Sequence, residues 1–216
     1  MDPDVALAAH LAANLDRGFP ALVDAHASRL YTIALRLLGV PGDAEEVAQD
    51  ALIRAYRALD GYEATRILEL QLRPWLATIT INLARNRRRR IADRRPAISL
   101  GPLVDAGLEP AERGESGPAI QAERADTRRL LAAALLELTP SVRAAVVLRH
   151  VDGLSVAETA AALRVPEGTV KAQVHRGLAR LRTHLDALED RGGNRPSGAA
   201  RPAPHPASIT VEEPTA

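Results

Sequence analysis

The sequence predicts an all-α protein made of two small helical domains joined by a flexible linker. Of its 216 residues, 46% are hydrophobic but only 2% are aromatic. Ala, Leu and Val supply most of the apolar residues, which favours helices over strands. Apolar residues recur at helical spacing in two stretches. The segments between and after these stretches are rich in Pro, Gly and Ala, the composition of linkers and tails.

These patterns divide the chain into an N-terminal segment, two domains, a linker and a disordered tail, at residues 1–18, 19–92, 93–125, 126–189 and 190–216. The chain contains no cysteine, which excludes disulfides and thiolate metal sites. Apolar runs fall short of the length that spans a bilayer, and the acidic N-terminus is not a signal peptide. We therefore expect a cytoplasmic protein without membrane insertion, cofactor or bound metal.

The first domain opens with a helix that ends at Gly39-Val40-Pro41-Gly42. Its apolar stripe is Leu22, His26, Leu30, Ile33, Leu37 and Leu38. In the next helix we expect Asp43 to be the N-cap and Glu46 to complete a capping box. The helix dipole favours acids in the first turn by about 0.3–1 kcal/mol each, but Asp50 lies beyond that turn. A surface for a basic partner is the alternative.

A third helix is predicted to begin at Pro74 and to become strongly basic toward its end. We expect Trp75, Leu76, Ile79 and Leu83 to be buried, and Thr78, Ile81, Arg85 and Arg88 to lie on the opposite face. Arg87–Arg90 are four consecutive arginines in a chain of net charge +1. Cations suit a helix C-terminus, and a solvated run is the alternative, but the mutual repulsion of four arginines points to nucleic-acid phosphate.

The second domain contains the pattern of a helix-turn-helix. An apolar helix is predicted first, with Leu130, Leu131, Ala134, Leu135 and Leu138. Thr139-Pro140 starts another helix, which Asp152-Gly153 ends. Ser155 and Glu158 then form a capping box for a short helix, and the turn 164–166 joins it to a helix that begins near Glu167.

This last helix combines a buried stripe with a polar face. The stripe is predicted to be Val170, Val174, Leu178, Leu181 and Leu185. The opposite side presents small residues among long polar ones, which lets a helix lie close in a major groove, where Arg and Gln read base edges and Lys and Arg hold phosphates. We expect DNA recognition by Thr169, Lys171, Ala172, Gln173, His175, Arg176 and Arg180.

Both halves together resemble the extracytoplasmic-function group of bacterial sigma-70 factors. RLYTIALRLLGVPGDAEEVAQDALIRAYRAL and RPWLATITINLARNRRRR are similar to parts of the family's domain 2. LTPSVRAAVVLRHVDGLSVAETAAALRVPEGTVKAQVHRGLARLR is similar to its domain 4. The resemblance implies a protein that binds core RNA polymerase, through the clamp coiled coil and flap regions, and directs it to promoters. Members are often held by an anti-sigma partner.

The resemblance also implies roles for residues. Polymerase binding falls on Asp43, Glu45, Glu46, Gln49 and Asp50. Contact with the −10 element falls on Tyr62, Thr78, Asn82, Arg85, Asn86, Arg88 and Arg89, with base capture by the loop from about Gly61 to Leu72. Contact with the −35 element is implied for the polar face of the last helix. Arg164 departs from the family, because many relatives have glycine at that turn.

Two other functions are alternatives. A helix-turn-helix regulator with a helical sensor domain would explain the C-terminal half, but not an acidic helix followed by an Asn/Arg helix. A nuclease or recombinase would need paired carboxylates, a Ser/His/Asp arrangement or a metal cluster, and the six histidines are scattered. We therefore expect a protein that is not an enzyme.

Overall fold

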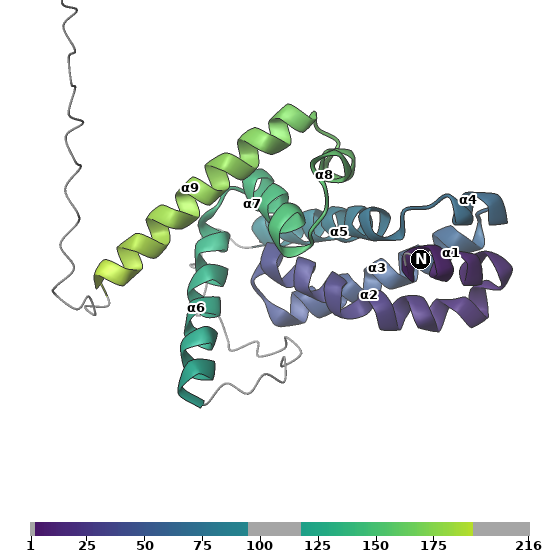
Figure 1. The fold of residues 1–216 in the computed structure, drawn as a ribbon, viewed down its shortest axis with the longest axis horizontal. Helices are drawn as coiled ribbons and strands as arrows, with labels where there is room; N and C mark the ends of the chain where they lie inside the picture. The colour runs from purple at the N-terminus through teal and green to yellow at the C-terminus, as the bar shows by residue number, and fades with distance from the viewer. Residues whose placement is uncertain (1–2, 95–117, 192–216) are drawn as a thin grey trace, which may run out of the picture.

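The computed structural model describes residues 3–94 and 118–191, which form two helical domains (Figure 1). The first domain contains α1 (Pro3–Ala13), α2 (Leu15–Leu38), α3 (Pro41–Asp60), α4 (Ala64–Leu68) and α5 (Leu72–Arg94). The second contains α6 (Pro118–Glu137), α7 (Pro140–Val146), the π-helical turn η1 (Val147–Val151), α8 (Val156–Leu163) and α9 (Glu167–Arg191). Residues 95–117 and 192–216, which hold most of the predicted linker and nearly all of the predicted tail, lie outside the described part, so those expectations stay predictions.

Helix ends in the first domain follow local chemistry. The Asn14 side chain accepts a hydrogen bond from the Arg17 N–H at 2.9 Å and caps α2. Gly39, at φ 76°, ends α2 in the left-handed conformation that glycine adopts freely. The predicted capping box of α3 is wrong, because Pro41 already occupies the first turn and Val40 is the cap residue. Asp43 therefore lies inside the helix.

The N-terminal segment is a helix that packs on α2. At Gly18 a side chain would place its Cβ 2.9 Å from the backbone nitrogen of Leu11, so the close crossing of α1 and α2 requires glycine. Leu7, Ala8 and Leu11 enter the core. The sequence pattern did not reveal this helix.

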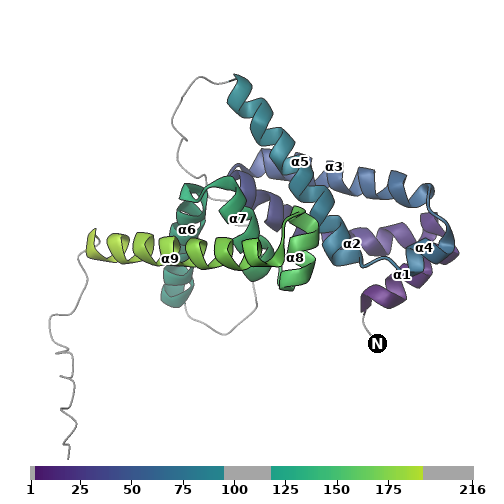
Figure 2. The same ribbon diagram turned by 90° about the horizontal axis from the view of Figure 1, so that it is seen from above.

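The two domains pack against each other and share a core. The stripe of α2 is buried as predicted, except Leu38, which is half-buried. Residues of the second domain complete this core: Ala144, Val147, Leu148, Leu154 and Ala162. A second, smaller cluster joins α6, α7 and α9 through Ala134, Leu135, Leu138, Val142, Val146 and Leu181. Figure 2 shows α7 and α8 beside α2 and α5, while α9 projects away from the first domain.

Helix α6 departs from the prediction in two ways. It begins at Pro118, inside the predicted linker. Leu130 and Leu131, expected in the core, are 41% and 40% exposed. Helix α6 packs against α9 and α2, and Ala134 is the first buried residue among its described side chains.

Candidate nucleic-acid interface

Helices α8 and α9 form the predicted helix-turn-helix. The capping box of α8 is confirmed: the Glu158 N–H donates to Ser155 Oγ at 3.1 Å, and the Ser155 N–H donates to Glu158 Oε2 at 2.6 Å. The hydrogen bond from the Ser155 N–H to the Glu158 carboxylate is the main cause that holds the pKa of this carboxyl below its ordinary value. The turn residue Arg164 is left-handed, at φ 56° and ψ 47°. The Val165 N–H closes the turn on the Ala160 carbonyl at 3.1 Å.

Arg164→Gly is expected to stabilise the protein by up to about 1 kcal/mol, because a side chain is penalised in this conformation. Urea unfolding of the whole chain measures the gain. Arg164→Ala is the matched control, since it removes the guanidinium but keeps the Cβ. A gain for Ala equal to that for Gly would assign the effect to the arginine side chain and contradict the backbone explanation.

The packing face of α9 matches the predicted stripe only in part. Val170 and Leu181 are buried, Val174 and Leu185 are half-buried, and Leu178 is 40% exposed. Gly177 lies on the buried face instead, where a Cβ would approach Val146 Cγ2 to 2.4 Å. The absence of a side chain lets α9 lie directly on α7, and this close approach rotates Leu178 outward. The prediction counted only large apolar residues, so it could not place Gly177 at the contact with α7.

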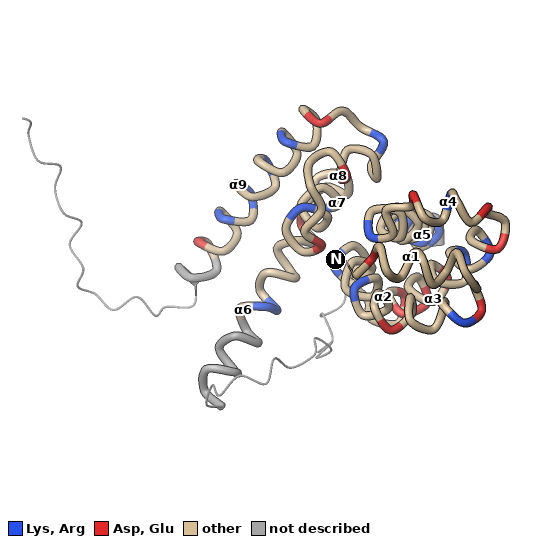
Figure 3. Tube along the Cα trace, turned by 45° about the vertical axis from the view of Figure 1, so that its right-hand side comes forward, with Lys and Arg blue, Asp and Glu red and all other residues tan. Residues whose placement is uncertain are grey.

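The other face of α9 is exposed and cationic. Lys171, Ala172, His175, Arg176 and Arg180 are exposed as predicted, and Figure 3 shows Lys and Arg recurring along the helix. Arg176 makes one long hydrogen bond, from Nε to the Ala172 carbonyl at 3.3 Å. Thr169 and Gln173 are half-buried, and the Gln173 Oε1 is turned into the protein without a hydrogen-bond partner among the described residues. Gln173 is therefore the member of the predicted set least available to a base edge.

Helix α5 is buried on more sides than predicted. Leu76 and Leu83 are in the core as expected, and Trp75 and Ile79 are half-buried. Ile81, however, was expected on the outer face and is only 3% exposed. The second domain covers this part of α5, so a wheel drawn for the first domain alone missed the contact. Thr78 is half-buried and donates to the Pro74 carbonyl at 2.8 Å.

The basic end of α5 divides into paired and unpaired arginines. Arg87 donates to Asp43 Oδ1 from Nε at 2.9 Å, and its Nη1 lies 2.5 Å from Glu46 Oε2. The bond to Asp43 is the main cause of a raised Arg87 pKa. These ion pairs join α5 to α3. Arg87, Asp43 and Glu46 therefore stabilise the packing of two helices within the first domain.

Three other arginines, Arg85, Arg88 and Arg89, have no ion-pair partner within the described residues. They line a cavity of about 400 Å³ between α5 and α7, together with Pro140 and Ser141. Burial, followed by the charges of Arg85 and Arg89, lowers the pKa of Arg88. Uncompensated guanidinium groups of this kind bind phosphate. Asn82 and Asn86 are exposed on the same helix.

The predicted base-capture loop holds the short helix α4. Tyr62 is half-buried, its ring centroid 6.4 Å from that of Trp75. The Arg66 guanidinium lies 3.7 Å from the Tyr62 ring centroid and covers one of its faces. A separate cavity of about 340 Å³ lies beside the loop, lined by residues from Leu68 to Pro74 and by α1. Tyr62 is not among the residues that line it.

The acidic surface of α3 lies on the first domain. Glu45, Glu46, Gln49 and Asp50 are exposed, and Asp43 is half-buried by its pairing with Arg87. Gln49 Nε2 donates to Glu45 Oε1 at 3.4 Å, a long contact that constrains neither side chain firmly. Ala44, Val47, Ala48 and Ala51 anchor the opposite face of the helix in the core. The four exposed polar side chains are therefore presented on a rigid helix.

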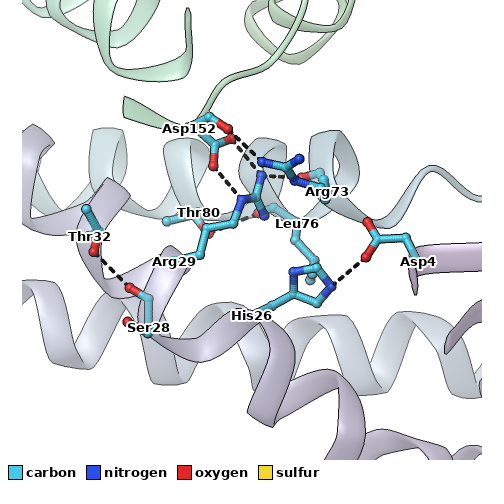
Figure 4. A network of polar contacts seen from close by, with 9 residues as sticks. All are labelled: Asp4, His26, Ser28, Arg29, Thr32, Arg73, Leu76, Thr80 and Asp152. Atoms are coloured by element: carbon cyan, nitrogen blue, oxygen red, sulfur yellow. Dashed lines mark hydrogen bonds and ion pairs between the residues drawn. The ribbon is translucent and has the colours of Figure 1, made fainter. Parts of the chain in front are cut away.

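A polar network that sequence reasoning missed joins the two domains (Figure 4). Arg29 on α2 donates from Nη2 to Asp152 Oδ2 at 2.6 Å, and the Asp152 side chain is 0% exposed. Arg73 donates from Nη2 to the Asp152 carbonyl at 2.8 Å. Asp152 was interpreted only as a helix end. The sequence holds one indication of this network. Arg29 lies between His26 and Ile33 on the buried face of α2, and a buried arginine requires a partner.

Beneath this network lies a buried histidine. His26 is 3% exposed, and its Nε2 is 3.5 Å from Asp4 Oδ1. Burial is the main cause that lowers the His26 pKa; Asp4 raises it, while Arg29 and Arg73 lower it further. The folded protein therefore holds His26 neutral at pH values where the unfolded chain takes up a proton.

Acidification is expected to weaken folding through His26. Stability is full above the unfolded pKa of 6.5 and falls as the pH drops below it, because only the unfolded state readily binds the proton. Urea unfolding at pH 7.5 and 5.5 measures this, and His26→Gln is expected to reduce the difference between them. The exposed His184→Gln is the control. An undiminished difference in His26→Gln would contradict the assignment.

The described residues contain no group of three metal-ligating side chains, and no helix among them is long and apolar enough to cross a membrane.

Family models match both domains. The model "Sigma-70 region 2" matches residues 22–95, and "Sigma-70, region 4" matches residues 128–181. The ECF RNA polymerase sigma factor SigE of Mycolicibacterium smegmatis is 38% identical over 165 residues, which are 76% of this chain and 60% of that protein. SigW of Bacillus subtilis is 29% identical over 79% of this chain and 90% of its own length. The RNA polymerase sigma-E factor of Streptomyces coelicolor is 34% identical over 79% and 88%.

Two solved structures share the fold. CnrH, in complex with the cytosolic domain of CnrY, has a TM-score of 0.59 and 28% identity, covering 86% of this chain and 99% of that one. The sigma factor RpoE from Bartonella quintana, in complex with the anti-sigma factor NepR, has a TM-score of 0.57 and 25% identity, covering 78% and 96%.

Proposed function

The chain belongs to the extracytoplasmic-function group of the sigma-70 family, and we propose that α3, α5 and α9 divide the work of promoter-directed transcription among them. The protein is a sigma factor that binds core RNA polymerase and directs promoter recognition. The reaction chemistry belongs to the polymerase, so this chain is not an enzyme, and its place of work is the cytoplasm, with the polymerase. The residue assignments rest on one acidic helix, α3, and two cationic helices, α5 and α9, most of whose charged side chains are exposed.

The exposed face of α9 is proposed to read the −35 element. Ala172 and Ala179 leave room for close approach to the major groove, and Arg176 and Lys171 reach beyond them. Gln173 has a smaller part than the sequence suggested, because its oxygen is buried. Thr169, half-buried at the helix start, is placed to contact a phosphate.

The exposed side of α5 is proposed to bind the −10 region. Asn82 and Asn86 supply amide donors and acceptors for base edges, and Arg85, Arg88 and Arg89 supply the phosphate contacts. Arg87 is excluded from this role, because Asp43 and Glu46 neutralise it. Tyr62 and the neighbouring loop would take up an unstacked base, which requires Arg66 to leave the tyrosine ring.

The acidic surface of α3 is proposed to dock on the clamp coiled coil of the polymerase. Glu45, Gln49 and Asp50 are the exposed members free of internal ion pairs among the described residues. The two similar solved structures are complexes with a regulatory partner, so we also propose an anti-sigma partner for this chain.

Run-off transcription tests the function. Purified protein mixed with core RNA polymerase is expected to start transcripts from promoters selected out of a random library. A conventional regulator with a sensor domain would give no transcript without a separate sigma factor. That alternative is not favoured, because its supposed sensor domain matches sigma-70 region 2.

A further inference from the structure

The cavity of about 400 Å³ between α5 and α7 combines an apolar wall with a cationic one. The apolar wall is formed by Leu37, Ile81, Ala84, Pro140 and Ala144. The cationic wall is formed by Arg85, Arg88 and Arg89. Small-molecule sites usually have volumes of roughly 300–1,000 Å³ and place a few polar groups among apolar walls. This cavity therefore has the size and the lining of a ligand site.

The three arginines of the cationic wall share one face of α5. Arg85 precedes Arg88 by three residues and Arg89 by four, so the helical repeat brings them together, and like charges at this spacing repel one another. No acid among the described residues lines the cavity, and Ser141 on α7 faces it with a hydroxyl group. An anion in the cavity would relieve the repulsion that the protein itself leaves uncompensated there.

The guanidinium of Arg143, on α7, adds positive potential from the second domain. Arg143 is 8% exposed, and it donates to the carbonyls of Leu37 at 2.7 Å and Leu138 at 3.1 Å, while its Nε has no hydrogen-bond partner among the described residues. Burial is the main cause that lowers the Arg143 pKa to about 10; the charge of Arg88 lowers it further, and Glu137 raises it. The positive potential therefore comes from both helices and not from α5 alone.

We propose that this cavity binds a small molecule that carries a diphosphate and an apolar or aromatic group, as a nucleoside diphosphate does. The diphosphate would lie against Arg85, Arg88 and Arg89, because guanidinium groups bind phosphate oxygens through paired, charge-assisted hydrogen bonds. The aromatic group would lie against the apolar wall, and the Ser141 hydroxyl would donate to a phosphate oxygen. The site does not depend on the promoter assignments, although a bound ligand would occupy arginines that are proposed for −10 phosphates.

Calorimetric titration of the full chain, without polymerase or DNA, tests the site with three probes. ADP carries both groups and is expected to bind more tightly than methyl diphosphate, which lacks the aromatic part. Adenosine lacks the diphosphate and is expected not to bind. Methyl diphosphate that binds as tightly as ADP would overturn the role of the apolar wall. Adenosine that binds as tightly as ADP would overturn the role of the arginines, and no binding of either diphosphate would overturn the site.

Arg88→Gln is expected to weaken ADP binding by about tenfold or more, because hydrogen bonds between charged groups are the stronger ones. Arg90→Gln is the matched control. It removes the same charge from the same run of arginines, but Arg90 is exposed and does not line this cavity, so its affinity for ADP is expected to stay close to that of the wild type. An equal loss in both variants would show attraction to the charge of the run alone and would overturn the site.

Ser141→Asp provides a second variant, which supplies a counter-charge to the arginines from α7 and is expected to abolish ADP binding. Ser141 is exposed in the first turn of α7, where an acid is favourable, so the variant is expected to fold. Ser141→Asn has nearly the same shape without the charge and is expected to bind ADP. Wild-type affinity in Ser141→Asp would place ADP outside the cavity and overturn the proposal. A wild-type holoenzyme that fails to transcribe would instead overturn the proposed function and leave this site standing.

Discussion

Arg176→Ala is expected to weaken discrimination among −35 sequences by about 1–3 kcal/mol, if the guanidinium pairs with a guanine as its place on α9 suggests. Arg176 is exposed, and its one internal hydrogen bond is long enough to be exchanged for a base at little cost. The measurement is transcription by the reconstituted holoenzyme from promoters that differ at single −35 positions.

Arg182→Ala provides the control, because Arg182 is exposed on the same helix but outside the predicted set. It should leave the preference among −35 sequences unchanged. An equal loss on every sequence for Arg176→Ala would make Arg176 a phosphate contact and would contradict its assignment to base reading.

Replacing Arg85, Arg88 and Arg89 with Gln is expected to flatten the salt dependence of promoter binding by the holoenzyme. Each phosphate contact contributes about 0.7–0.9 to the slope of log affinity against log salt, so the triple variant should lose about two units or more. Preference among sequences should change little, because phosphates carry no base identity. Promoter binding titrated between low and high salt measures the slope.

Arg87→Gln is the matched control from the same run of arginines. It is expected to leave the slope unchanged and to lower the stability of the chain instead, because it breaks the pairing with Asp43 and Glu46. A triple variant with the wild-type slope, or an Arg87 variant that alone flattens it, would contradict the division of this run into structural and DNA-facing arginines.

Local signals predicted much of this molecule. The α8 capping box, the end of α2 at Gly39 and the turn at Arg164 depend on neighbours in sequence, and the structure confirms them. The exposed polar face of α9 followed from helical periodicity. The residues of the candidate interface were therefore found mainly where a single helix presents a side chain to solvent.

The failures share one physical cause, which is packing between elements distant in sequence. Gly177 belongs to the buried face only because α7 lies against it. Asp43 was predicted to be an N-cap from its neighbours in sequence alone. Its actual partner in an ion pair, Arg87, is remote in the chain, so the local pattern could not reveal it. Ile81 looked exposed until the second domain covered it, and Asp152 looked like a helix end because its ion pair crosses between domains. Periodicity within one helix carries none of this information.

Photocrosslinking in the holoenzyme tests the central claim most directly. A benzophenone side chain placed at His175 on α9, or at Asn82 on α5, is activated on a promoter selected by the same holoenzyme. We expect His175 to crosslink the −35 element and Asn82 the −10 element. Crosslinks from both positions to one element, or from neither to DNA, would contradict the assignment of two separate helices to two separate promoter elements.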